Sequence, residues 1–453
     1  AIRFVYIYHY LFGIREGMKN KDGRLGDGIL SLCEYIVAQN EDPFIETSGV
    51  HEPGLFAAQM EVAHLLEGAL QSDDLYLTRE QLDRIRSLLI LLSHHPDPMP
   101  DSSDSTGFDP FTHSLNCIRG VTMHGIFRYS LYLVNQQEKQ TGQSLHKGYL
   151  EPEIQQLLEE KLDLTKEPSL AVHAVYGVFV PSLHYLSDEW LERHLASIFP
   201  EEEAYWRAAW DAYISVCNVY PDVFRLLIPQ YQRGLRLLSQ PQDEEKRSFG
   251  SPHERLAQHL MSAYLTYLTD FNHENGLLEL FFINAPDAIR AQGIFWLGKV
   301  LESIKPSSKH DLWRKCWLLW QKRLEFAKPQ EVSQNSQEIS EYMLWLENCP
   351  VELGLLYPTL QQSVKYLPDD FHARQLIEYA ARYGDRFSLE AVSLLQQTIL
   401  SAKEPRWRFS EKDEEKILKA AMASGDEKAR QIAVAVINYQ GECGDFRWRP
   451  LLD

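Results

Sequence analysis

The chain has 453 residues, an aromatic content of 11% and a formal net charge of −19. This length exceeds what one hydrophobic core usually supports, so the sequence predicts two or three domains or one repeat array. The acidic balance disfavours duplex nucleic acid and anionic membrane surfaces as partners, because both require a basic face on the protein.

The six cysteines are scattered, with no CxxC pair, which favours buried reduced thiols over a zinc site or a redox pair. This pattern indicates a cytoplasmic protein. The sequence contains no run of about 18 apolar residues, so no membrane span is predicted. The apolar start, Ala1 to Gly13, lacks a basic leader and a small-residue cleavage site, so it is not expected to be a signal peptide. We expect residue 1 to lie inside a longer natural chain.

Residues 1–110 form the first predicted domain, a helical segment that ends in an Asp-rich linker. Thr78 and Gln81 form the capping box of its last helix. His94 and His95 at the end of that helix suit its C-terminal dipole better than a metal site. The loop Pro96–Pro110 lacks the EF-hand pattern, so a solvated linker is favoured over a calcium site. The predicted helices are Ile2–Gly13, Gly28–Gln39, Pro53–Gln71 and Thr78–His94.

Residues 111–330 form the second predicted domain, a central helical array. One long helix is expected from Phe111 to about Gln137, with Asn116, Arg119 and His124 in a buried hydrogen-bond set. Val172–Pro181 is expected to be a short buried helix that the proline breaks. The other predicted helices here are Pro152–Leu162, Ser169–Tyr185, Asp188–Phe199, the helix after Glu201 that carries Trp206 and Trp210, Pro221–Leu238, Ser251–Asp270, the helix from Asn284 to Ile304, and Lys309–Ala327.

Gly293 to Lys299 spells GxxxxGK, the start of a phosphate-binding loop. The final Ser or Thr is missing, and the four residues between the glycines are Ile, Phe, Trp and Leu. We therefore expect a packed helix here. We also expect the stripe of Trp313, Trp317 and Trp320 to be buried in the core, because residues at this spacing share one face of a helix.

Residues 331–453 form the third predicted domain, a train of short C-terminal helical repeats. Gly384 and Gly425 follow helix ends, as C-terminal caps do. Helix pairs recur at a loose interval of about 35–40 residues, which predicts an all-α solenoid of stacked hairpins, TPR-like or HEAT-like. The helices are Gln337–Asn348, Pro350–Tyr357, Thr359–Tyr366, Asp370–Tyr383, Leu389–Ala402, Glu411–Ala423 and Asp426–Tyr439.

Several short segments resemble the C-terminal helical regions of bacterial antiviral STAND NTPases of the NACHT-like, Avs type. They cover about three quarters of the chain, and each is short and degenerate. The resemblance is carried by Asp109-Pro110 with Asn116, Arg119 and Gly120, Tyr176 to Pro181 with Trp190, Ile198 to Pro200, Arg290 with Trp296 to Gly298, and Gly444 to Phe446 with Leu451-Leu452.

The resemblance implies that this chain is the sensor of a three-part protein, which binds a phage protein such as the terminase large subunit or the portal. ATP and Mg²⁺ are then expected in an upstream ATPase domain and no cofactor or metal in this chain, which is expected not to be an enzyme. Binding would trigger self-association and activate an upstream effector. Aromatic and arginine residues are typical of interface hot spots. The candidate partner-binding residues are Trp206, Trp210, Arg406, Trp407, Arg408, Arg447 and Trp448.

Three alternatives remain open. The C-terminal aromatic residues could instead seal the end of the repeat array as a cap. The chain could be a structural scaffold that mediates self-assembly of an effector enzyme elsewhere in the polypeptide. It could also be a hydrolase that uses the Asp-rich loop, with Asp101 and Asp104, or the pair His94-His95.

Overall fold

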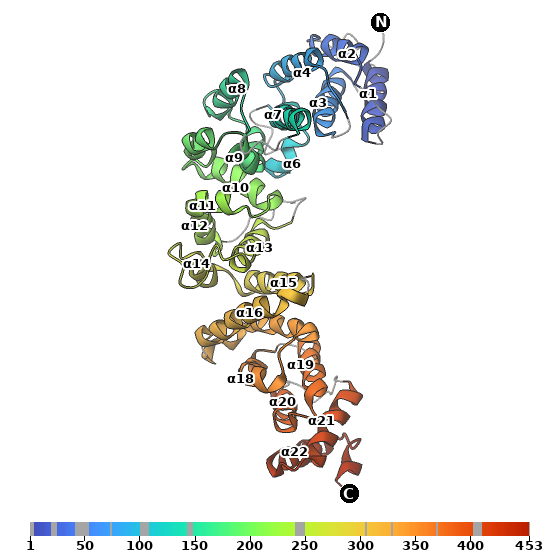
Figure 1. The fold of residues 1–453 in the computed structure, drawn as a ribbon, viewed down its shortest axis with the longest axis vertical. Coiled ribbons are helices and arrows are strands. Elements are labelled where there is room, and N and C mark those ends of the chain that lie inside the picture. Colours follow the sequence, from blue (N-terminus) through green and yellow to red (C-terminus); the bar gives the residue numbers. More distant parts are fainter. Residues whose placement is uncertain are drawn as a thin grey trace. The chain divides into compact units, whose positions relative to one another are not determined.

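A computed structural model describes residues 4–19, 25–40, 54–72, 75–99, 108–142, 148–240, 250–303, 306–327, 329–367, 370–401 and 410–452. Helices make up the regular structure throughout these residues, and no strand occurs among them (Figure 1). The predicted all-α class is confirmed. The chain divides into two compact units, Ala1–Gln230 with Gln242–Pro252, and Tyr231–Pro241 with His253–Asp453.

In unit 1, helices pack both against adjacent helices and against helices two or more places along the sequence, as stacked helical hairpins do. The helix α3 contacts α1 and α7, and α9 contacts α6, α7 and α10. The bounds are α1 Phe4–Lys19, α2 Asp27–Val37, α3 Leu55–Gln71, α4 Arg79–Leu92, α6 Pro110–Ser114, α7 Ile118–Thr141, α8 Pro152–Leu162, α9 Leu170–Ile198, α10 Glu203–Val216 and α11 Pro221–Leu226, and α12 Ile228–Leu237 crosses the boundary between the units.

Unit 2 repeats this pattern. The helix α15 contacts α17, α19 contacts α20, and α20 contacts α21 and α22. The bounds are α13 Pro252–Leu265, α14 Leu277–Asn284, α15 Asp287–Ser303, α16 Pro306–Phe326, η1 Pro329–Gln334, α17 Ser336–Glu341, η2 Tyr342–Asn348, α18 Leu353–Ser363, η3 Val364–Tyr366, α19 Asp370–Tyr383, α20 Ser388–Ser401, α21 Glu411–Ala423, α22 Glu427–Glu442 and η4 Arg449–Leu451.

The division into units differs from the expected domain boundaries after residues 110 and 330. Both positions lie inside a unit, because α3 and α4 pack on α7 across the first, and α15 and α16 pack on α17 across the second. Along the sequence, the unit changes instead after Gln230, Pro241 and Pro252. The last two positions bound the expected linker Pro241–Pro252, of which residues 241–249 lie outside the described part of the chain.

The expected single helix from Phe111 to Gln137 is wrong, since α6 ends at Ser114 and α7 begins at Ile118. The break follows from a contact distant in sequence. Asp97 accepts the Ile118 N–H through its side chain at 2.6 Å and the Arg119 N–H through its carbonyl at 3.1 Å. A carboxylate placed at these free N–H groups stabilises a new helix start.

The expected break at Pro181 is also wrong, because α9 continues through the proline and kinks instead at Ser187, with φ −163° and ψ 95°. A proline inside a helix leaves the carbonyl four residues earlier without its N–H partner. The thiol of Cys217 approaches this site, 3.9 Å from the Gly177 carbonyl and 3.2 Å from the Val178 carbonyl. The thiol therefore offers a weak hydrogen-bond donor to the α9 carbonyls next to the proline.

Among the described residues, α9 is the helix whose length and composition would allow it to cross a membrane. However, 61% of the residues in its apolar window are buried within the protein. It packs against α6, α7, α8 and α10. Such burial is typical of a core helix in a soluble protein.

Two other expectations concern glycines. Gly384 and Gly425 follow helix ends as expected, but neither adopts the left-handed conformation, which Gly142 and Gly444 adopt with φ of 65° and 91°. The GxxxxGK segment lies within α15, which confirms the packed helix. A Cβ atom on Gly298 would come within 2.8 Å of the Trp345 ring, so this glycine permits close helix packing.

All six cysteines lie in the described residues, and none of them forms a disulfide. Five are buried, and Cys443 is exposed, which corrects the expectation that all are buried. Burial raises the pKa of Cys33, Cys117, Cys217 and Cys316 to about 12.

Candidate functional site

Two of the predicted partner-binding residues lie in the core of unit 1. Trp206 and Trp210 are 1% and 3% exposed, and their rings stack with centroids 5.7 Å apart. The indole N–H of Trp206 donates to the Gln230 side chain at 2.8 Å. Their burial corrects the expectation that these rings are available to a partner. Their spacing of four residues on α10 is equally typical of a buried stripe.

The C-terminal candidates fold back onto α21. Trp448 is buried, and its indole N–H donates to Glu414 at 3.1 Å. Arg447 is partly exposed and binds Asp445 and Glu411 at 2.6 and 2.7 Å. These contacts favour the cap interpretation for this pair. Arg406, Trp407 and Arg408 lie outside the described residues.

The polar residues that suggested a hydrolase have structural partners. His95 accepts the Asp97 N–H and contacts Gln59 at 3.1 Å, and His94 contacts Glu160 at 3.2 Å. Among the described residues, no group of three or more His, Cys, Asp or Glu side chains could hold a metal ion. Asp101 and Asp104 lie outside the described residues.

A buried Ser–His pair, Ser114 with His124 at 3.1 Å, also lies within unit 1. Burial lowers the pKa of His124 to about 3, so the imidazole is neutral near pH 7. Arg119 donates to the carbonyls of His95 and Pro98 and to Glu167. Arg119 and His124 belong to the hydrogen-bond set expected between the helices of unit 1. Asn116 does not, because it is exposed and its side chain donates to the nearby Thr112 carbonyl.

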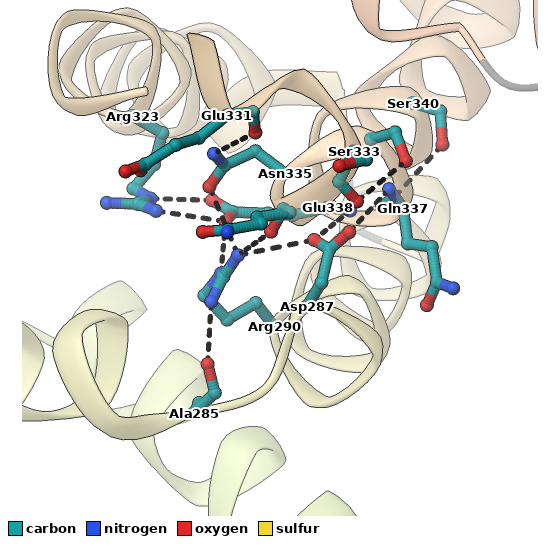
Figure 2. A network of polar contacts seen from close by, with 12 residues as sticks. Ala285, Asp287, Arg290, Arg323, Glu331, Ser333, Asn335, Gln337, Glu338 and Ser340 are labelled. Atoms are coloured by element: carbon teal, nitrogen blue, oxygen red, sulfur yellow. Dashed lines mark hydrogen bonds and ion pairs between the residues drawn. The ribbon is translucent and has the colours of Figure 1, made fainter. Parts of the chain in front are cut away.

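A second buried polar network joins α15, α16 and α17 in unit 2 (Figure 2). The fully buried carboxylate of Glu338 accepts from Arg290 at 2.5 Å and from Arg323 at 2.6 Å. Arg290 also donates to the carbonyls of Ala285 and Gln334, both at 2.6 Å. Asp287 accepts the Gln337 and Glu338 N–H groups, so it caps the start of α17. Every charge here has protein partners, which is typical of a structural clamp.

The candidate site with unusual geometry lies at the end of α13. Tyr267 has a φ of 63°, the only positive φ among the described non-glycine residues. The N–H groups of Tyr267 and Leu268 donate to the carbonyls of Tyr264 and Ala263, which is the Schellman pattern. Its left-handed position usually holds glycine, and a tyrosine there costs about 1–2 kcal/mol. A strained residue at a surface suggests a function for its side chain.

The loop after Tyr267 is held rigidly by Asn275. Its side-chain oxygen accepts from the Thr269 hydroxyl at 2.9 Å and the Leu277 N–H at 3.2 Å. Its amide donates to the Leu268 carbonyl, and its own carbonyl accepts from Gln232 at 3.1 Å. A buried asparagine with these bonds fixes both ends of the loop.

This loop presents aromatic side chains along α16. Tyr267 is 68% exposed over Lys315, whose Nζ lies 3.2 Å from the ring centroid. Phe271 stacks on Phe282 and contacts Phe326, which is 58% exposed. Lys315 and Phe326 are eleven residues apart, which is three turns or about 16 Å along one helix face. We call Tyr267, Phe271, Phe326 and Lys315 the aromatic loop surface, which the buried ring of Phe282 on α14 supports from the core.

Sequence reasoning missed this surface. The helix expected to run from Ser251 to Asp270 ends instead at Leu265, and no local motif predicts a left-handed tyrosine. The closest signal was the group of Asn, His and Gly residues from Asn272 to Gly276, which is typical of a turn.

Comparison with known proteins adds no assignment, because no family model, curated protein or solved structure matches this chain.

Proposed function

We propose that the chain is a recognition module that binds another protein, and specifically the sensor region of a bacterial anti-phage defence NTPase. In this proposal the bound partner is a phage protein, such as the terminase large subunit or the portal. Binding then drives oligomerisation through an upstream ATPase domain that uses ATP and Mg²⁺, and it activates an upstream effector.

The observation that carries the proposal is the aromatic loop surface in unit 2. Exposed aromatic side chains on a rigid support lose little conformational entropy on binding, so they serve well as interface anchors. Tyr267 and Phe326 are well exposed, and Asn275 and the Schellman bonds fix the loop that begins at Tyr267. The polar network around Glu338 resembles a structural support more than a catalytic site.

Charge defines the partner further. With a net charge of −19, the chain repels acidic proteins and attracts basic ones over long range. We therefore infer a partner whose contacting face carries Lys and Arg side chains around an apolar centre. Association should slow as salt is added, because ions screen these charges.

The test measures binding of the purified chain to a purified phage terminase large subunit and a portal protein. Replacing Tyr267 by Gly and Phe326 by Ala together should weaken binding at least about thirtyfold, which corresponds to the loss of roughly 2 kcal/mol expected for hot-spot aromatics. The glycine keeps the left-handed backbone accessible. Tyr76→Ala in unit 1 is the matched control, since Tyr76 is 69% exposed.

If the chain binds neither phage protein, the proposed identity of the partner is wrong. Equal loss of binding in the Tyr76→Ala control would show that the aromatic loop surface is not the interface.

A structural scaffold is the second candidate function, and α1 favours it. This helix exposes Tyr6, Tyr10 and Phe12, and its sequence from Phe4 to Ile14 contains no Asp, Glu, Lys or Arg. An uncharged aromatic face could pair with the same face of a second copy, because no like charges oppose it. Sedimentation velocity of the wild-type chain and of a Tyr6→Ser, Tyr10→Ser variant tests this: a dimer that the substitutions dissociate supports the scaffold.

A further inference from the structure

The loop that follows α4 ties this helix to the start of α7. Asp97 accepts the first two N–H groups of α7, one through its side chain at 2.6 Å and one through its carbonyl at 3.1 Å. The Arg119 guanidinium on α7 donates in turn to the carbonyls of His95 and Pro98 at 2.7 and 2.8 Å. The loop and the start of α7 therefore hold each other in place, and we call residues 95–98 the α7-binding loop.

The hydrogen bonds of this loop require a neutral imidazole at His95. Its Nδ1 atom accepts the Asp97 N–H at 3.0 Å, so Nδ1 carries no proton. Its Nε2 atom lies 3.1 Å from the Gln59 side-chain oxygen, so Nε2 carries the proton and donates to that oxygen. The Gln59 amide nitrogen donates to the carbonyls of Ile36 and Gln39, which fixes the oxygen as the atom that faces the ring. The contacts thus select one neutral tautomer.

A second proton on the His95 ring is incompatible with these contacts. The protonated imidazole is a donor at both nitrogens, so its Nδ1–H and the Asp97 N–H would point at each other. The Asp97 N–H would then lose its acceptor, which is unfavourable for a group away from water. Because His95 is only partly buried, the ring can relieve this conflict by moving into solvent, where the charge is hydrated.

The charges around His95 act in both directions. Burial lowers the pKa of His95, the Asp97 carboxylate opposes this shift, and the Arg119 guanidinium adds to it. That guanidinium is itself paired with Glu167 at 3.0 Å. Helix α3 contributes the uncharged ring of Phe56, whose centroid lies 6.3 Å from the imidazole, beside the amide described above. The other titratable groups of the surrounding segments are His94, which contacts Glu160, and His113 and Cys117, which lie near Asp97.

The direction of the pH dependence follows from the lowered pKa. The released histidine binds a proton more tightly than the histidine in the loop. The contribution of these contacts to stability is therefore fully present above about pH 6.5, the ordinary pKa of histidine, and is lost as pH falls below that value.

We propose that His95 is an acid-sensitive switch, in which protonation of Nδ1 removes the acceptor of the Asp97 N–H, releases the α7-binding loop and frees the start of α7. The helix α7 packs against α3, α4, α6 and α9, so its release loosens the centre of unit 1. The proton comes from solvent, which reaches the partly buried ring. This switch does not depend on the proposed function.

Cys117 provides an internal probe of the release. It is fully buried, and it is the N-cap residue of α7, directly before the N–H groups that Asp97 binds. The full chain is treated with a pyridyl disulfide at pH 7.5 and pH 5.0, and labelling of each cysteine is followed by mass spectrometry. Each rate is divided by the rate of the same cysteine in urea at the same pH, which removes the intrinsic pH dependence of the thiol.

The normalised rate at Cys117 should rise at least about fivefold from pH 7.5 to pH 5.0. The maximum is about thirtyfold, for a histidine that takes up its proton only after release. Cys316 in unit 2 is also buried and reports general unfolding in acid, so its normalised rate should stay low at both pH values.

A His95→Asn variant separates the proton from the loop. The Asn side-chain oxygen can take the place of Nδ1 and accept the Asp97 N–H, and it does not titrate. Cys117 labelling in this variant should therefore change less than about twofold between the two pH values. His94→Asn is the matched control, because His94 is exposed and contacts Glu160 on α8, and it should keep the wild-type rise. Circular dichroism checks that both variants are folded.

Three results would disprove the switch. The first is a normalised Cys117 rate that does not rise in acid. The second is an equal rise at Cys316, which would mean that the whole chain unfolds. The third is a rise in His95→Asn as large as that of the wild type, which would place the titrating group elsewhere.

Discussion

Gly177 lies in α9 where the backbone of α10 passes very close. A Cβ atom at this position would lie 1.9 Å from the Ala209 carbonyl oxygen, so the two helices would have to separate. We expect Gly177→Ala to lower the free energy of unfolding by about 3 kcal/mol, the upper range for overpacked cores. Urea unfolding followed by circular dichroism measures the change.

Gly68→Ala is the matched control, because this glycine also lies inside a helix, α3, but has open space around it. Its substitution should stabilise the chain by about 0.5–1 kcal/mol through better helix propensity. Equal effects of the two substitutions would contradict the close contact between α9 and α10.

Glu414 makes the C-terminal cap sensitive to pH. Burial raises its pKa above the ordinary value, although Trp448 and Arg447 oppose the shift. A folded-state pKa above the unfolded one means that the native state binds the proton more tightly, so this stability is fully present below about pH 4.5 and is lost as pH rises through the folded pKa. Glu414→Gln should therefore remove part of the pH dependence of stability on the alkaline side of pH 4.5.

Urea unfolding at pH 5 and pH 7.5 measures this difference. The control is Glu415→Gln on the same helix, which removes an exposed pair with Lys419 and should leave the pH dependence as in the wild type. If the stability of Glu414→Gln depends on pH as strongly as that of the wild type, Glu414 does not have this role.

At the scale of elements, the network around Glu338 ties α15, α16 and α17 together. Removing its charge leaves Arg290 and Arg323 buried without their common partner. We expect Glu338→Gln to destabilise unit 2 by about 3 kcal/mol or more. Glu302→Gln, which breaks the exposed pair with Lys299, should cost less than about 1 kcal/mol. Thermal unfolding of both variants tests the difference, and similar melting temperatures would mean that the clamp contributes little.

The helices themselves were predictable where their signals are local. The capping box of Thr78 and Gln81 forms as expected, and α8, α19 and α21 have the predicted bounds. The failures have distant causes. Asp97 binds the N–H groups at the start of α7, and the Cys217 thiol contacts carbonyls of α9 near Pro181. Both partners are distant in the sequence, so neither contact could be deduced from the surrounding residues.

The candidate site was less predictable than the helices. Trp206 and Trp210 have a spacing that suits either a core or an interface, and only packing decides between them. The conformation of Tyr267 follows from a helix end that normally requires glycine, so its residue type gives no warning of it.

At the scale of the whole molecule, the all-helical class was predictable from periodicity, but its division into two units was not. Each unit has its own set of buried residues. We expect calorimetry to resolve two unfolding transitions, because domains with separate cores unfold independently. Gly177→Ala should lower one melting temperature and Glu338→Gln the other, and a joint shift of both transitions would contradict separate cores.

The contrast between Cys443 and the five buried thiols has a practical consequence. A maleimide dye should attach at one position in the native chain and at all six after denaturation. This would give site-specific conjugation without mutagenesis. The dye would lie at the C-terminal end of α22, close in sequence to Arg447 and Trp448, which bind α21. Counting attached dyes over time would then report how often each unit opens.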